Sequence, residues 1–94
     1  MLRVPEVPKG SAILVLFPER HLSRFIQVNL ERQGFKVWTA ENASEAAALA
    51  LHHKPVLLII DGELDVEQVA FDLRGIPGCE EMGLLPCSPK SGSI

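Results

Sequence analysis

Cysteine is scarce in this sequence, and the shortage excludes several kinds of protein. The 94 residues include only Cys79 and Cys87, with no CxxC pair and no histidine at zinc-ligand spacing. Two such thiols are too few for a disulfide-stabilised fold or a structural zinc site. Sparse cysteine is typical of a reducing compartment, so we expect a cytoplasmic protein.

Long hydrophobic runs and aromatic clusters are missing as well. The longest apolar runs are AILVLF and VLLII, far below the ~20 apolar residues that cross a bilayer. The start, MLRVPEVPKGS, has prolines and a glutamate where a secretory signal needs an apolar block. Aromatic residues are 5% of the chain, none is interleaved with a basic cluster, and the net charge is −3. We therefore expect neither a membrane nor a nucleic acid as partner.

The charged residues that are present are unevenly distributed. Residues 1–54 contain seven Lys or Arg against five Glu, whereas residues 61–81 contain seven acids against Arg74 alone. Such an acidic segment is either a solvated rim or a face that attracts a cation or a basic partner, and both interpretations stay open.

The hydrophobic pattern predicts strands alternating with helices. Short apolar runs typical of strands occupy residues 12–17, 35–40, 56–60 and 82–88. Helical spacing follows the first three runs, and Asn42 and Asp65 stand as N-caps of the second and third helices. This alternation argues for one α/β domain, a parallel sheet with helices on both faces. We expect the domain to span residues 11–88, with a flexible leader at 1–10 and a flexible tail at 89–94.

A series of spaced residues links the first predicted strand to the third. It comprises Gly34-Phe35, Ala40, Asn42-Ala43, Ala46 and the stretch from Pro55 to Asp61. In this order and spacing, residues 12–61 resemble the receiver domain of two-component response regulators, and residues 62–88 resemble it more weakly. The resemblance implies a flavodoxin-like sheet of order 2-1-3-4, a role in a phosphorelay, and no enzymatic activity. It also implies a protein partner, either a histidine kinase or an output domain.

By this resemblance, Asp61 takes the place of the aspartate that accepts a phosphoryl group. Phosphoryl transfer depends on neutralising negative charge, normally with Mg²⁺, and in the family an acidic pair after the first strand helps hold that ion. Here those positions are Phe17-Pro18, and neither has a side-chain oxygen. We therefore expect no metal and no cofactor, with Glu19, Glu63 and Asp61 itself as weak candidates for a makeshift Mg²⁺ site.

Three roles for Asp61 follow: a structural residue that caps or hydrogen-bonds in its loop, a recognition residue on an acidic edge, or a working phosphoacceptor. The first two correspond to a pseudo-receiver that acts by protein–protein interaction without Mg²⁺-dependent phosphorylation, which is the function we favour. One alternative is an atypical but active receiver phosphorylated on Asp61. Another is an unrelated flavodoxin-like domain that binds a ligand, although FPERH lacks the glycine of a phosphate-binding loop.

The family's last strand and last two helices have no counterpart in this sequence. The fourth strand is therefore expected at an edge of the sheet, where a proline is tolerated. An unpaired edge is a template for another chain, so we expect either a homodimer through this strand or docking on a larger partner. Equally, the chain can be a piece of a longer protein. The candidate residues here are Leu84, Leu85, Pro86 and Cys87 for the partner-facing edge, and Ser88 for the family's switch hydroxyl.

Overall fold

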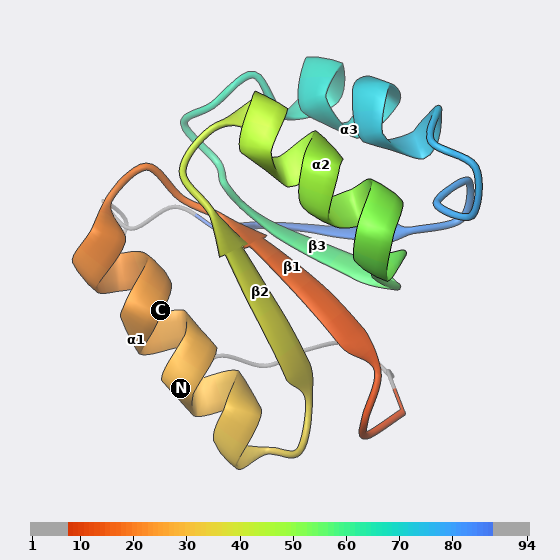
Figure 1. Cartoon of the computed structure of the whole chain (residues 1–94). Coiled ribbons are helices and arrows are strands. Elements are labelled where there is room, and N and C mark those ends of the chain that lie inside the picture. Colours follow the sequence, from red (N-terminus) through yellow and green to blue (C-terminus); the bar gives the residue numbers. More distant parts are fainter. Residues whose placement is uncertain (1–7, 88–94) are drawn as a thin grey trace.

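The computed structural model describes residues 8–87, and its elements follow the predicted order. The strands β1 (Ala12–Leu16), β2 (Lys36–Ala40), β3 (Leu57–Asp61) and β4 (Gly83–Cys87) alternate with the helices α1 (Arg20–Arg32), α2 (Ala43–His53) and α3 (Val66–Arg74) (Figure 1). All pairings are parallel and the strand order is β2-β1-β3-β4. The predicted α/β, flavodoxin-like fold class is confirmed. Residues 1–7 of the predicted leader and the whole predicted tail lie outside the described residues.

Capping residues account for where α2 and α3 begin and where α1 ends. Asn42 Oδ1 accepts a hydrogen bond from the Glu45 N–H at 2.8 Å, and Asp65 Oδ1 accepts one from the Gln68 N–H at 3.2 Å. Each bond satisfies a backbone donor that has no partner within the helix, so both predicted N-caps are confirmed. Gly34, just past α1, has a φ of 98°, a left-handed conformation that favours glycine.

The helices cover both faces of the sheet. Helix α1 packs on one face, and α2 and α3 pack on the other (Figure 1). Alternate residues of β1 contribute to the two cores, with Ile13 and Val15 toward α1 and Leu14 and Leu16 toward α2 and α3. Because both faces are buried, the central strands are continuous apolar runs rather than alternating ones.

The strand order brings the ends of β1 and β3 together. These two central strands are parallel neighbours, and β2 and β4 are the edges. The chain leaves β1 for β2 on one side and then returns to β3 on the other, which makes the gap between the ends of β1 and β3 a switch point in strand order. In sheets of this kind, ligands and reactive groups gather at such a point.

Candidate functional site

Asp61 is the last residue of β3, and the strand holds its backbone at the carboxyl edge of the sheet. The four residues before it are at most 1% exposed, whereas Asp61 is only half-buried. Its Oδ1 accepts a hydrogen bond from the Glu63 N–H at 2.9 Å, and its C=O accepts one from the Leu64 N–H at 3.0 Å. A rigid strand thus presents this carboxylate, and the turn that follows engages one of its oxygens.

The turn after Asp61 lies against the end of β4. The Gly62 N–H donates to the Cys87 C=O at 2.6 Å, and a Cβ on residue 62 would lie 3.1 Å from that oxygen. This close approach accounts for the glycine that follows the aspartate. Cys87 is the register partner of Asp61. Burial raises the pKa of the Cys87 thiol, and the negative charge of Asp61 raises it further. Nothing in the sequence pattern indicates this pairing, because register between distant strands is not a local property.

The carboxyl end of β1, beside that of β3, carries no side-chain oxygen. Phe17 is 0% exposed and belongs to the core under α1, while its N–H donates to the Ala40 C=O at 3.1 Å. Pro18 is exposed and has neither a side-chain oxygen nor an N–H. A hard cation such as Mg²⁺ requires oxygen ligands, and these two side chains supply none.

Glu19, a candidate ligand from the sequence, is the N-cap of α1. Its Oε1 accepts from the His21 N–H at 2.8 Å and its Oε2 from the Leu22 N–H at 3.0 Å. The hydrogen bond from His21 lowers the pKa of this carboxyl group, desolvation opposes that lowering, and the bond from Leu22 adds to it. Because both oxygens serve the first turn of α1, a cation at Glu19 would compete with the start of the helix.

The remaining ligand candidates do not form a cluster with Glu19. Glu63 contributes its backbone N–H to Asp61. Ser88, the candidate switch hydroxyl, lies outside the described residues. Within residues 8–87, no three or more His, Cys, Asp or Glu side chains are grouped so that they could hold a metal ion. In the same stretch, no helix combines the length and the apolar character that crossing a membrane requires.

The predicted partner-facing edge is at the border of the sheet, but most of its side chains are packed. Among residues 8–87, strand β4 pairs with β3 alone, as expected. Leu84 packs against the core under α2 and α3, whereas Leu85 and Cys87 pack against the core under α1. Pro86 is the one exposed residue of the four. A partner-facing role for this edge stays a prediction.

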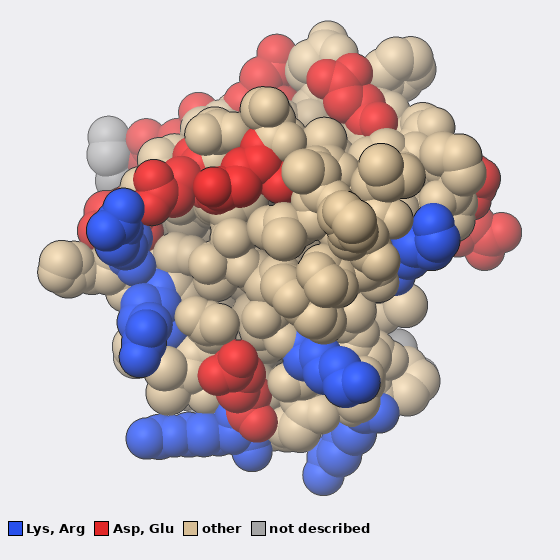
Figure 2. Space-filling model, viewed as in Figure 1, with Lys and Arg blue, Asp and Glu red and all other residues tan. Residues whose placement is uncertain are grey.

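Acidic and basic side chains occupy different parts of the surface. In the view of Figure 2, most Asp and Glu lie in the upper part, where Figure 1 shows α2 and α3, and most Lys and Arg lie along the left and lower margins. An ion pair of 2.9 Å between Arg20 and Glu41 joins the two regions at the start of α1. The acidic segment noted in the sequence, residues 61–81, includes the whole of α3.

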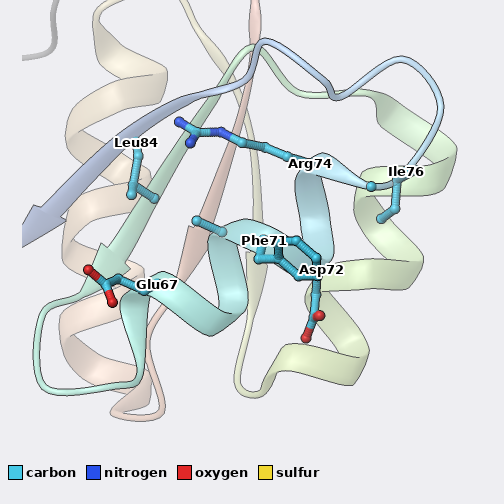
Figure 3. Close-up of a pocket in the computed structure, with 8 residues that line it drawn as sticks. Glu67, Phe71, Asp72, Arg74, Ile76 and Leu84 are labelled. Carbon is cyan, nitrogen blue, oxygen red and sulfur yellow. The ribbon is translucent and has the colours of Figure 1, made fainter.

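An apolar groove of about 700 Å³ lies between α3 and β4 (Figure 3). Val69, Ala70 and Leu73 have helical spacing in the sequence and form the buried apolar stripe of α3. Phe71 lies off that stripe and is 77% exposed, so the periodicity does not mark it as functional. The groove is lined by Glu67, Ala70, Phe71, Asp72, Arg74, Gly75, Ile76 and Leu84.

Comparisons with known proteins identify the fold. No protein-family model matches the sequence, and no curated protein matches it either. The chain is similar to a solved structure of the chemotaxis protein CheY4 from Vibrio cholerae, with a TM-score of 0.75 and 19% identity over 88% of this chain and 75% of that one. It is also similar to a response regulator receiver domain protein from Clostridium thermocellum, with a TM-score of 0.69 and 22% identity over 79% of this chain and 61% of that one. The chain therefore has the fold of response-regulator receiver domains, and it spans less than two thirds of the second of these structures.

Proposed function

We propose that this chain is a receiver-like signalling domain that binds a protein and is not switched by Mg²⁺-dependent phosphorylation. The fold supports a place in two-component signalling. The burial of Phe17 supports the absence of Mg²⁺-dependent phosphorylation. Its buried ring occupies the position where the resemblance predicts an acidic Mg²⁺ ligand. On this proposal the domain is not an enzyme and needs no cofactor.

Electrostatics supports the loss of phosphorylation. A carboxylate that attacks a phosphate group approaches a negative charge, and Mg²⁺ normally neutralises that charge. Magnesium is usually held by one or two carboxylates in near-octahedral geometry. Asp61 has one oxygen engaged in its own turn, and the nearest acid after β1, Glu19, has both oxygens engaged in a helix cap. Neither Asp61 nor Glu19 therefore has both carboxylate oxygens free for the ion.

An atypical but active receiver is the second candidate. One observation favours it: Asp61 is half-buried at the end of a rigid strand, as a nucleophile should be. The third candidate, an unrelated ligand-binding domain, has less support. A phosphate at the start of α1 would need the free N–H groups of that helix, and Glu19 already accepts from those of His21 and Leu22.

Beryllofluoride, a mimic of the phosphoryl group, separates the first two candidates when it is added with Mg²⁺. We expect no saturable change in the amide chemical shifts of Asp61, Gly62 and Glu63 in ¹H–¹⁵N spectra. Asp61→Asn is the specific variant, since it keeps Oδ1 for the turn. Asp72→Asn is the matched control on α3. Saturable shifts that disappear in Asp61→Asn and persist in Asp72→Asn would establish an active receiver and refute the proposal.

A histidine kinase or an output domain in the cytoplasm is the partner class that this function implies. A homodimer through the free edge of β4 is the other predicted association. Analytical ultracentrifugation that detects only monomer at high protein concentration would exclude the homodimer and leave docking on a different protein.

A further inference from the structure

We propose that the groove between α3 and β4 binds one amphipathic helix of a partner protein, with the helix's apolar side in the groove and its Lys or Arg side chains on the acidic rim. The inference rests on the proposed function, a domain that works by protein contact, and it specifies the partner's chemistry.

The lining of the groove is mainly apolar, and Phe71 is its largest hydrophobic side chain. Its ring lies between Ile76, after α3, and Leu84 of β4 (Figure 3). Among the described residues, Phe71 is the most exposed large hydrophobic side chain, at 77%. Aromatic side chains dominate the contacts of protein interfaces when a partner covers them. Phe71 is therefore the expected anchor of the contact.

The rim of the groove selects for positive charge. Glu67 and Asp72 of α3 contribute to the lining, and Asp72 Oδ1 also accepts a hydrogen bond from Gln68 Nε2 at 3.0 Å. The basic residue of the lining, Arg74, already donates from Nε and Nη2 to the Met82 C=O, at 3.1 and 2.9 Å. Residues 61–81 contain seven acids against this one arginine. Complementarity of charge thus favours a basic partner over an acidic one.

The backbone of β4 argues against a strand as the occupant. The Gly83 N–H donates to the Val56 C=O, and the Cys87 C=O accepts from Gly62, so both residues direct backbone groups toward β3 and its ends. Backbone groups alternate between the two sides of a strand, so those of Leu84 and Pro86 point to the free edge. Proline has no N–H, so within β4 only Leu84 offers a donor outward. Continuous strand addition is therefore disfavoured.

A helix avoids this problem because it satisfies its own backbone hydrogen bonds. It needs only side-chain contacts, made by apolar residues at i, i+3 or i+4, and i+7. Three turns of helix are about 16 Å long, comparable with the nine residues of α3 beside which it would lie. Basic residues on the side of the helix that faces α3 would then lie near Glu67 and Asp72.

The test uses a synthetic helical peptide of leucine and lysine with an amphipathic spacing. A scrambled peptide of the same composition carries the same charge without the apolar stripe. In ¹H–¹⁵N titrations of the full chain, we expect the amphipathic peptide to shift amides of α3 and β4 and to bind at least about tenfold more tightly than the scrambled one. Phe71→Ala should weaken binding about tenfold or more. The matched control is Phe25→Ala, because Phe25 is 54% exposed on α1.

A charge variant tests the rim independently. Glu67→Lys should weaken binding and reduce its dependence on salt, whereas Glu31→Lys, on α1, should change neither. Both positions are exposed, so the fold should persist, and the dispersion of the same spectra reports on it.

Several results would overturn the inference. They are unchanged affinity in Phe71→Ala, equal affinity for the scrambled peptide, or shifts that map away from α3 and β4. Another is self-association that Phe25→Ala and Phe71→Ala abolish equally, since the occupant would then be α1 of a second copy. None of these results bears on the proposed absence of phosphorylation. That proposal is refuted only if Mg²⁺ and beryllofluoride change the amide chemical shifts around Asp61.

Discussion

Replacing Phe17 by alanine tests whether its ring stabilises the hydrophobic core. The ring is 0% exposed and packs in the cluster beneath α1. Truncating a buried phenylalanine to alanine costs about 3–5 kcal/mol. A domain of 94 residues is stable by roughly 5–14 kcal/mol at the usual value per residue. We therefore expect Phe17→Ala to lose about a fifth or more of the free energy of unfolding.

Urea unfolding followed by tryptophan fluorescence measures this loss. The chain has one tryptophan, Trp38, which is half-buried in β2 and stacked on His53 with ring centroids 3.9 Å apart. Its emission should change when the two rings separate on unfolding. The matched control is Phe25→Ala, whose ring is 54% exposed on α1. That variant should stay within about 1 kcal/mol of the wild type.

A loss below about 1 kcal/mol in Phe17→Ala would refute the reasoning, because the ring would then not be needed for packing. Phe17→Asp provides the complementary result. A carboxylate in place of this buried ring would lie within the apolar cluster beneath α1 and should destabilise the domain at least as much as alanine does. A Phe17→Asp variant with wild-type stability and measurable Mg²⁺ affinity would show that the acidic ligand can be restored without loss.

The remaining predictions concern caps and the carboxyl edge. Asn42→Ala should cost about 1 kcal/mol in urea unfolding, because it removes the N-cap of α2. The pKa of Glu19 is lowered from its ordinary value of 4.5, so the ionised carboxylate stabilises the fold at pH values above 4.5. This contribution is lost as the pH falls through the folded pKa. In Glu19→Gln, the free energy of unfolding measured in urea should therefore fall less steeply as the solution is acidified. Asp61→Asn should lower the pKa of the Cys87 thiol and speed its alkylation by iodoacetamide, measured by mass spectrometry, while Cys79 is unchanged.

The secondary structure could be predicted because its signals are local. Apolar runs of strand length, helical spacing and the side chains of Asn42 and Asp65 all act within a few residues. The parallel sheet followed from the alternation of strands and helices. The strand order did not follow from periodicity, which cannot distinguish one neighbour from another, and came from the resemblance of residues 12–61 to receiver domains.

The details of the candidate site depend on contacts between segments that are distant in the sequence. Local sequence patterns do not predict such contacts. The register that sets Cys87 opposite Asp61 is one example. The outward direction of Pro86 is another, since it depends on which residues of β4 pair with β3. The exposure of Phe71 required knowing that no described element covers that side of α3. Glu19 was visible as an acid near the end of β1, but its role as a cap depends on where α1 begins.

The end of β1 also explains why a metal site and a stable core compete in this chain. A small domain buries only about 60–70% of its unfolded surface, so each large buried side chain matters. In the part of the chain that the structure describes, α1 is the one helix on its face of the sheet. Phe17 extends the core of that face beyond the last residue of β1, and Leu22 and Cys87 pack against the same cluster. An acid at this position would supply a ligand oxygen but remove the apolar ring from the core. A substitution that restores the metal ligand would therefore lower the stability of the fold.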